Sequence, residues 1–327
     1  PVIYAPDADC PRWRTFITEI MQGDKARADY LQKAIGYSLT GDTRMECLFI
    51  LYGPTSRNGK GTTMESILRI MGEYGKNADP TMLQAKFNSQ SGGPSEEIAR
   101  LAGSRFVNIS EPEKKITLDA ALTKRLTGND TITARYLHEN SFEFRPNFKI
   151  FINTNHRPNI TDLTLFESGR IKIIPFDRHF EENEQDKDLK STFAKPENMS
   201  GILNWMLEGY KLFRSQGLAM PDSVVQATTD YQIFSDKMGQ FFDECIEEKE
   251  GCELRRGAVY TRYKEWCGEN GYRAEAAKNL NQEIEKRYKT ARKRPNDGAS
   301  SSTTPMVLDV AFTASEESKE DFAPLTS

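Results

Sequence analysis

Residues 48–65 read LFILYGPTSRNGKGTTME and bring together the residue types that hold the phosphates of a nucleotide. Glycines in a turn let backbone N–H groups converge on phosphate oxygens, and a lysine can reach the β- and γ-phosphates. A helix that begins at such a turn presents the positive end of its dipole to the phosphates. The stretch therefore predicts a phosphate-binding loop for ATP with Mg²⁺, with these contacts: Gly53, Asn58, Gly59, Lys60, Gly61, Thr62 and Thr63.

This loop departs from the usual pattern in two places. Five residues, not four, separate Gly53 from Gly59, and Gly61 occupies the position where a serine or threonine normally follows the lysine. The hydroxyl of that residue helps to hold Mg²⁺, so Thr62 is the candidate for a phosphate or magnesium contact. The alternative is a surface turn with a solvated lysine, which the preceding apolar run and the following helical pattern disfavour.

Three further polar residues flank short apolar runs, Glu111 and Asn155 after one and Arg170 before one, and could complete a hydrolytic site. Glu111 ends the run that begins at Phe106 and could coordinate Mg²⁺ or polarise the attacking water, with Glu113 as a further carboxylate. Asn155 could hydrogen-bond the γ-phosphate and the lytic water, and Arg170 could reach the nucleotide of a neighbouring subunit. The alternatives are a solvated glutamate, a turn-forming asparagine and a surface ion pair.

The elements that must position these residues alternate between strands and helices. We expect strands at 47–52, 106–110, 149–153 and 171–175, with helices at 62–71 and 118–126 between them. This alternation predicts an α/β fold with a mainly parallel sheet. Residues 1–44 and 198–250 have helical periodicity, and 202–213 and 237–249 are the clearest helices of the second segment.

The order and spacing of five motifs resemble the superfamily III helicase core, and in particular the helicase half of phage, plasmid and poxvirus primase-helicases. The resemblance covers most of residues 1–245. The motifs are Gly53–Thr63, Arg105–Glu113, Leu122–Arg135, Phe148–Pro158 and Gly169–Phe176.

The resemblance implies an AAA+-like ATPase that forms a ring, usually a hexamer, and translocates on single-stranded DNA. It implies that Lys60 is the phosphate lysine, Glu111 the Walker B acid, Asn155 the polar sensor and Arg170 the arginine that acts in trans. Many relatives carry two adjacent arginines before the last strand. Here Gly169 replaces one of them, so that Arg170 or Lys172 must act alone.

A hairpin precedes the strand that ends at Asn155. The alternating runs 131–137 and 142–144 flank a polar turn. The resemblance implies that this hairpin projects into the ring channel and grips the DNA backbone, where cations contact phosphates of any sequence. The candidates for this contact are Arg135, His138 and Lys124, and the alternative is a solvated hairpin.

The segment 251–314 predicts a winged-helix-like module, with helices at 258–269 and 279–288 and a strand, a polar loop and a returning strand at 289–312. The stretch from Arg273 to Arg294 contains eight Lys or Arg residues and three Glu, which gives it a net charge of +5. These cations could bind the phosphates of duplex origin DNA, or they could form an ordinary solvated face. The candidates are Lys286, Arg287, Lys289, Arg292, Lys293 and Arg294.

Composition restricts the other possibilities. The five cysteines contain no Cys-x-x-Cys pair, which disfavours a disulfide framework or zinc site and favours a reducing, cytoplasmic setting. No apolar run approaches the roughly 18 residues of a membrane span, and the net charge of −4 excludes a uniformly basic surface. The start at Pro1 suggests a piece of a longer chain, in which the resemblance implies an upstream primase-polymerase domain.

We therefore expect five segments: an N-terminal helical segment (1–44), an AAA+-like core (45–197), a helical segment (198–250), the winged-helix-like module (251–314) and a flexible tail (315–327). The predicted function is an ATP-dependent, ring-forming DNA helicase of a phage or other mobile element. Two alternatives stay open. One is an ATP-assembled origin-binding initiator that does not unwind DNA, and the other is a nucleoside-phosphate kinase, because Gly-Lys-Gly-Thr also occurs in adenylate-kinase-like loops.

Overall fold

The computed structural model describes residues 2–85, 96–110, 116–293 and 303–313. The chain divides into two compact units, Pro1–Ser235 and Asp236–Ser327. The predicted N-terminal helices therefore belong to the same unit as the sheet. The predicted tail, 315–327, lies outside the described residues.

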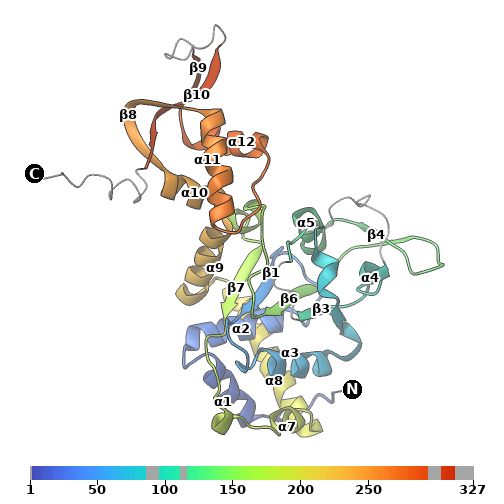
Figure 1. Ribbon diagram of the computed structural model, residues 1–327. Helices are drawn as coiled ribbons and strands as arrows, with labels where there is room; N and C mark the ends of the chain where they lie inside the picture. The colour runs from blue at the N-terminus through green and yellow to red at the C-terminus, as the bar shows by residue number, and fades with distance from the viewer. Residues whose placement is uncertain (1, 86–95, 111–115, 294–302, 314–327) are drawn as a thin grey trace, which may run out of the picture. The chain divides into compact units, whose positions relative to one another are not determined.

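A five-stranded parallel sheet forms the centre of the N-terminal unit (Figure 1). Its order is β2-β3-β6-β1-β7, so neighbours in space are mostly separated in sequence by helices. The strands are β1 (Leu48–Tyr52), β2 (Gly75–Ala78), β3 (Phe106–Ser110), β6 (Lys149–Thr154) and β7 (Ile171–Pro175). This sheet confirms the predicted fold class, an α/β AAA+-like core, and it places the carboxyl ends of all five strands at one edge.

Helices cover both faces of this sheet because the buried strands are apolar on both sides. Phe49 and Leu51 belong to one core and Leu48 and Ile50 to the other, as the two-residue period of a strand requires. The first core contains residues of α1 (Pro11–Ile20), α2 (Lys25–Tyr37), α3 (Lys60–Met71), α7 (Leu189–Phe193) and α8 (Pro196–Gln216). The second contains residues of α4 (Glu96–Ala99), α5 (Ala120–Thr127), α6 (Thr164–Glu167) and α9 (Asp222–Ser235).

The short connecting elements of this unit are the 3₁₀ turns η1 (Gly72–Tyr74), η2 (Pro80–Leu83) and η3 (Glu182–Glu184) and the hairpin strands β4 (Ile132–Ala134) and β5 (Phe142–Phe144). The hairpin confirms the predicted one, although its first strand is shorter than the expected 131–137. β4 and β5 pair in antiparallel fashion from Ile132–Phe144 to Ala134–Phe142, so residues 135–141 form the connecting loop.

Helices α2 and α8 meet through glycine. A Cβ built on Gly36 would lie 2.2 Å from the backbone nitrogen of Tyr210, and one built on Gly209 would lie 2.1 Å from the carbonyl oxygen of Gln32. Only a residue without a side chain permits two helix backbones to approach this closely. The N-terminal helices are thereby fixed against the helix that follows the sheet.

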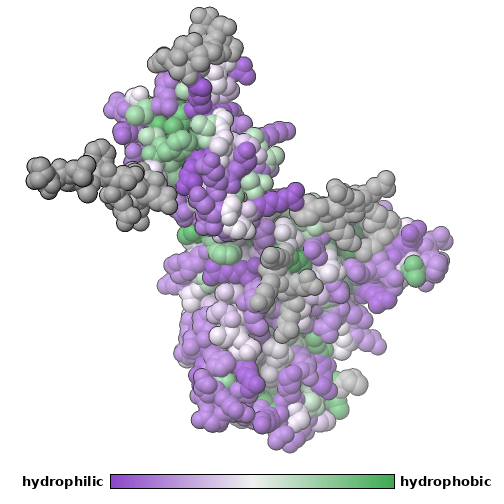
Figure 2. Space-filling model, viewed as in Figure 1, coloured by the Kyte–Doolittle hydropathy of each residue, from purple (hydrophilic) through white to green (hydrophobic). Residues whose placement is uncertain are grey.

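The C-terminal unit contains the predicted two helices followed by two paired strands. Its elements are α10 (Lys237–Cys245), β8 (Ile246–Arg255), α11 (Arg256–Glu269), α12 (Ala277–Arg287), β9 (Thr290–Lys293) and β10 (Thr304–Phe312). The strands form an antiparallel sheet in the order β8-β10-β9. Hydrophobic residues gather over this sheet on the face shown in Figure 2, whereas polar residues cover most of the same face of the N-terminal unit.

One helix prediction was wrong in this unit. The helix expected at 237–249 ends at Cys245, and Ile246 begins a strand that pairs with Phe312 of β10. The glutamates and lysine of 247–250 favour a helix by local propensity. The apolar side of β10, with Val307 and Val310 buried, supplies the tertiary pairing that overrides it.

Candidate nucleotide and DNA site

The predicted phosphate-binding loop connects β1 to α3 at the carboxyl edge of the sheet. Gly59 has a φ of +86°, which turns the chain into the helix that begins at Lys60. A Cβ at Gly59 would lie 2.4 Å from Cγ2 of Ile20, and one at Gly53 would lie 2.3 Å from the carbonyl oxygen of Phe176. Close packing therefore requires glycine at both positions, and the turn requires it at Gly59 as well.

The loop lysine and the sensor asparagine come together at this edge. The Lys60 side chain is 4% exposed, and its Nζ lies 2.7 Å from Oδ1 of Asn155 and 3.2 Å from the carbonyl oxygen of Gly53. Asn155 directly follows β6, which is the neighbour of β1 in the sheet. Two residues separated by 95 positions in sequence thus converge beside the predicted phosphate loop.

Two of the predicted phosphate contacts support the loop from within. Asn58 is buried and donates a 2.6 Å hydrogen bond to the carbonyl oxygen of Thr55. The buried Thr63 hydroxyl donates to the carbonyl oxygen of Gly59 at 2.9 Å. Thr62 instead lines an open cleft beside the loop, and at Gly61 no atom lies within 4 Å of an added Cβ.

A segment that sequence reasoning missed holds the lengthened loop. After β7 the chain runs back along the loop, where the Phe180 N–H donates to the carbonyl oxygen of Arg57 at 2.9 Å. Nδ1 of His179 lies 2.8 Å from the carbonyl oxygen of Ser56, and Gln185 accepts a hydrogen bond from the Arg57 guanidinium. We call residues 176–186 the ledge. Most of the hydrogen bonds between the ledge and the loop involve backbone carbonyl groups of the loop. No residue type in the sequence therefore predicts them.

The predicted Walker B acid follows β3, the other neighbour of β6. Ser110, the last residue of β3, is in register with Asn153, two residues before Asn155. Glu111 and Glu113 themselves lie outside the described residues. Among the residues that are described, no group of three His, Cys, Asp or Glu could hold a metal ion.

A polar chain that the sequence did not predict, with Asn108 and Asn153 buried and its other members exposed, crosses β2, β3 and β6 just below this edge. Nδ2 of Asn153 donates to Oδ1 of Asn108 at 3.0 Å and to the Ser110 hydroxyl at 2.9 Å. Asn108 donates in turn to Oδ1 of Asn77 at 2.8 Å. The chain ties the strand that ends before Glu111 to the strand that ends before Asn155.

Arg170 lies at the opposite edge of the sheet from the loop. Ile171 is in register with Leu48, so Arg170 is beside Cys47 at the amino end of β1, roughly 20 Å along the strand from Gly53. Its guanidinium forms a 2.8 Å ion pair with Glu46 and donates to the Thr127 hydroxyl at 2.9 Å. The chain's own phosphate loop is thus out of its reach.

Two of the three predicted contacts with single-stranded DNA lie in the hairpin and are exposed to solvent, and the third lies on α5. Arg135 and His138 are exposed, and within the described part of the chain neither has a hydrogen-bond or ion-pair partner. Lys124 on α5 instead donates to Asp162 and to Thr164, both at 2.8 Å. Burial raises the pKa of Asp162, but the hydrogen bonds that it accepts from Lys124 and from the hydroxyl and N–H of Thr164 outweigh it and hold the pKa below its usual value. Arg145, which sequence reasoning overlooked, is a further exposed cation beside β5.

The predicted duplex contacts of the C-terminal unit fall into two groups. Lys286 pairs with Glu283 at 2.5 Å, Arg287 with Asp236 at 2.9 Å, and Lys293 with Glu253. Lys289 and Arg292 are exposed, and neither side chain has a hydrogen-bond or ion-pair partner among the residues that the structure describes. Arg294 lies outside them.

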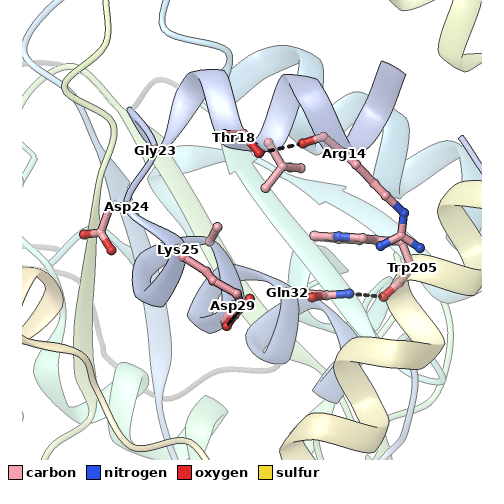
Figure 3. Close-up of a pocket in the computed structure, with 10 residues that line it drawn as sticks. Arg14, Thr18, Gly23, Asp24, Lys25, Asp29, Gln32 and Trp205 are labelled. Atoms are coloured by element: carbon pink, nitrogen blue, oxygen red, sulfur yellow. Dashed lines mark hydrogen bonds and ion pairs between the residues drawn. The ribbon is translucent and has the colours of Figure 1, made fainter. Parts of the chain in front are cut away.

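A second cavity, of about 370 Å³, lies between α1, α2 and α8 (Figure 3). Its polar lining is engaged within the chain: Arg14 bonds to Asp9 and Glu208, Lys25 to Asp29, and Gln32 to the carbonyl oxygen of Trp205. These pairs leave no unpartnered group directed at a ligand, and we assign none to this cavity.

Comparisons with known proteins agree with the predicted resemblance. A family model described as poxvirus D5 protein-like matches residues 234–314, and one described as a family of unknown function matches residues 51–170. "Putative helicase L207/L206" of Acanthamoeba polyphaga mimivirus is 28% identical over 269 residues, which are 76% of this chain and 28% of the relative. "Putative helicase 022R" of Frog virus 3 is 26% identical over 272 residues, which are 78% of this chain and 28% of the relative. The chain thus spans less than a third of these relatives.

The fold has solved counterparts. The apo structure of the NrS-1 C-terminal region matches with a TM-score of 0.56 and 12% identity, covering 95% of this chain and 77% of that one. Together these matches confirm the predicted resemblance to a superfamily III-type helicase domain, and they support a helicase-like role. No helix in the described residues is long and apolar enough to cross a membrane.

Proposed function

We propose that this chain is the ATP-hydrolysing motor of a DNA helicase that works as a ring, usually of six subunits, on single-stranded DNA. The observation that supports this most directly is the 2.7 Å contact between Lys60 Nζ and Asn155 Oδ1 at the carboxyl edge of the sheet. A lysine from a glycine-rich loop and an amide from the adjacent strand are the groups that a terminal phosphate needs. The glycines at 53 and 59, where any Cβ would clash, fit a turn that wraps phosphate oxygens.

Within this proposal each residue has a definite task. Lys60 binds the β- and γ-phosphates, and Asn155 holds the γ-phosphate and orients the attacking water. Glu111 is the acid that polarises this water and contributes a magnesium ligand, and the proposed ligand Thr62 would stand in for the hydroxyl that Gly61 lacks. Bound Mg²⁺ would neutralise charge on the β- and γ-phosphate oxygens.

The position of Arg170 supports a ring. Because it lies at the far edge of the sheet from its own loop, it can serve catalysis only by reaching the nucleotide of a neighbouring subunit. The intrasubunit pair with Glu46 would have to open when a neighbour docks. Lys172, the alternative cation, lies on the adjoining strand β7.

The hairpin supports DNA tracking. Arg135 and His138 in the loop and Arg145 after β5 give the hairpin exposed basic residues, and a phosphate grip requires no base-specific contact. Lys124 would first have to exchange Asp162 for a phosphate.

A second function, origin binding without unwinding, is favoured by the C-terminal unit. Lys289 and Arg292 are exposed cations beside and on the edge strand β9, and they could contact duplex phosphates. Strand displacement measured beside duplex binding separates the two functions, because an initiator of this kind binds the duplex without separating its strands.

The test of the proposed function is the Lys60→Ala variant. Without the ammonium group the γ-phosphate loses its main counter-charge, and we expect ATP hydrolysis stimulated by single-stranded DNA to fall at least about 100-fold. Lys76→Ala, which removes an exposed lysine from the edge strand β2, is the matched control and should hydrolyse ATP at the normal rate. Activity in Lys60→Ala equal to that of the control would refute the assignment of the site.

A further inference from the structure

Arg157, in the loop after β6, has its guanidinium surrounded by aromatic rings. Its Cζ atom lies 5.0 Å from the ring centre of Tyr52, 5.6 Å from that of Tyr231 and 4.9 Å from that of Phe234. Tyr52 ends β1, and the other two rings belong to α9, which packs against β7 (Figure 1). All four residues are in the N-terminal unit. Cation–π contacts thus hold the arginine side chain in place.

The rings attract the charge of this guanidinium but accept none of its N–H groups in a hydrogen bond. In the described part of the chain Arg157 has no hydrogen-bond or ion-pair partner, and its Nε is buried. A buried charged donor without an acceptor is costly, and proteins rarely keep one. The guanidinium therefore requires an acceptor that the described residues do not supply, and its fork of donors matches a carboxylate.

The position of Arg157 relates it to the proposed ring. It follows Asn155 by two residues and so lies at the carboxyl edge of the sheet, where Lys60 also lies. In a ring that brings Arg170 of one subunit to the phosphate loop of the next, this carboxyl edge faces the amino edge of the neighbour. The acceptor is therefore to be sought at the amino edge of a second copy of the chain.

Glu46 supplies a carboxylate at that amino edge. Its side chain pairs with Arg170 at 2.8 Å and is 43% exposed. When Arg170 turns to the neighbour's nucleotide, Glu46 loses its counter-charge at the interface between two subunits, where an unpaired charge is costly. The same step thus frees a carboxylate and brings it toward an arginine that lacks one.

We propose that Glu46 of one subunit and Arg157 of the next form an ion pair when the ring assembles. This inference rests on the proposed function, because it needs the neighbour that an arginine acting in trans requires. Glu46 exchanges one arginine for another, which offsets the cost of opening its pair with Arg170. Release of Arg170 then depends on the neighbour, and a lone subunit keeps this arginine paired.

Cross-linking of two cysteine variants tests the contact. Arg157→Cys and Glu46→Cys are mixed in equal amounts with ATP and single-stranded DNA and treated with a short bismaleimide, since the Cβ atoms of a Glu–Arg pair lie further apart than a disulfide spans. In the matched control Lys76→Cys replaces Glu46→Cys and puts the new thiol on exposed β2, three strands from β1. Four of the five native cysteines are buried, and Cys252 is common to both mixtures.

We expect a cross-linked dimer in the first mixture, in at least about tenfold greater amount than in the control, because only neighbouring thiols have a high effective concentration. The assembled mass of the wild type is measured by light scattering under the same conditions. Assembly with equal amounts of dimer in the two mixtures, or with none, would overturn the ion pair and leave the proposed ring standing. If the wild type stays a monomer, the proposed function fails and the ion pair fails with it.

A second measurement separates association from chemistry. Arg157→Met keeps an apolar stem among the rings and removes the charge, and Arg214→Met removes another arginine that lies over a tyrosine ring, on the exposed side of α8. We expect Arg157→Met to need an at least about tenfold higher protein concentration for half-maximal ATP hydrolysis, with an unchanged rate per assembled subunit. Arg214→Met should match the wild type. An unchanged concentration dependence in Arg157→Met, whether its rate is lower or normal, would overturn the intersubunit pair.

Discussion

The two departures of the phosphate loop from the usual pattern have different physical explanations. The extra residue is accommodated by Arg57, whose φ of +58° is unusual for a residue with a side chain, and by the Phe180 N–H that binds its carbonyl oxygen. The missing hydroxyl has no such structural cause. Gly61 has no positive φ, and nothing lies within 4 Å of an added Cβ.

Gly61→Ser should therefore fold normally and restore the missing hydroxyl. A serine favours the helix over glycine by a few tenths of a kcal/mol, and its oxygen would offer a magnesium ligand. We expect half-maximal ATP hydrolysis at a lower Mg²⁺ concentration, by about three- to tenfold. The measurement is a magnesium titration at saturating ATP. Gly257→Ser, at an open position in the first turn of α11 without a positive φ, is the control. An unchanged requirement would show that the hydroxyl is not used.

Lys149 makes stability depend on pH. Its ammonium group lies at the amino edge of the sheet, where it donates to the carbonyl oxygens of Thr40 and Asp42, and burial lowers its pKa from the ordinary 10.5 to about 7. Between these two values the unfolded chain binds more protons than the folded one. The free energy of unfolding should therefore rise with pH from pH 7, by at most about 1.4 kcal/mol per pH unit.

Urea unfolding of the wild type and of Lys149→Met, measured from pH 7 to 8.5, tests this dependence. Lys149→Met should be less stable overall, because two carbonyl groups lose their donor, but its pH slope should be flatter. Lys76→Met, at an exposed position, should keep the wild-type slope. Identical slopes in all three proteins would contradict the assignment. Above this range buried thiols with raised pKa values, such as Cys47, would complicate the comparison.

At the scale of elements, the sequence predicted those whose own residues carry the signal. Four of the five sheet strands are apolar runs, and α3 begins after a glycine turn that chemistry alone identifies. β2 was missed because Gly75–Ala78 is a polar edge strand that pairs with β3 alone. β8 was missed because its glutamates favour a helix unless β10 is there to pair with it.

The site shows the same limit of prediction. Lys60 and Asn155 were predicted because each residue type and its position after a strand indicate its chemistry. The ledge was not, because its contacts with the loop are made largely through backbone N–H and C=O groups. The partners of Lys124 and Arg170 were also out of reach, since Asp162 and Glu46 become neighbours only when the chain folds.

The glycine contact between α2 and α8 gives a sharp test at this scale. Gly209→Ala places a Cβ against the backbone of Gln32, and neither helix can move away without disturbing the core. We expect a loss of about 2 kcal/mol or more in the free energy of unfolding. Gly268→Ala, in α11 with open space around it, should instead be neutral or stabilising by up to about 1 kcal/mol. Chemical denaturation compares them, and equal stability of the two variants would contradict the close contact.

At the scale of the whole molecule, the residues proposed for ATP hydrolysis lie at opposite edges of the sheet. Lys60 and Asn155 lie at its carboxyl edge, and Arg170 lies at its amino edge. No rearrangement within an intact sheet brings them together. If Arg170 takes part in hydrolysis, each site must be composed of two subunits, with the loop of one facing the arginine of the next.

Mixing two inactive variants distinguishes this arrangement from a self-contained site. Lys60→Ala and Arg170→Ala should each abolish hydrolysis, but a ring assembled from equal amounts contains sites with an intact loop facing an intact arginine. Random assembly makes these about a quarter of all sites, and hydrolysis should recover to that order when the two proteins are combined with single-stranded DNA. The control mixture is Lys60→Ala with Asn155→Ala. Because both residues serve the same subunit's site, this mixture cannot restore activity. Recovery in neither mixture, with both variants folded and assembled, would mean that Arg170 only supports Glu46 and Thr127 within its own subunit.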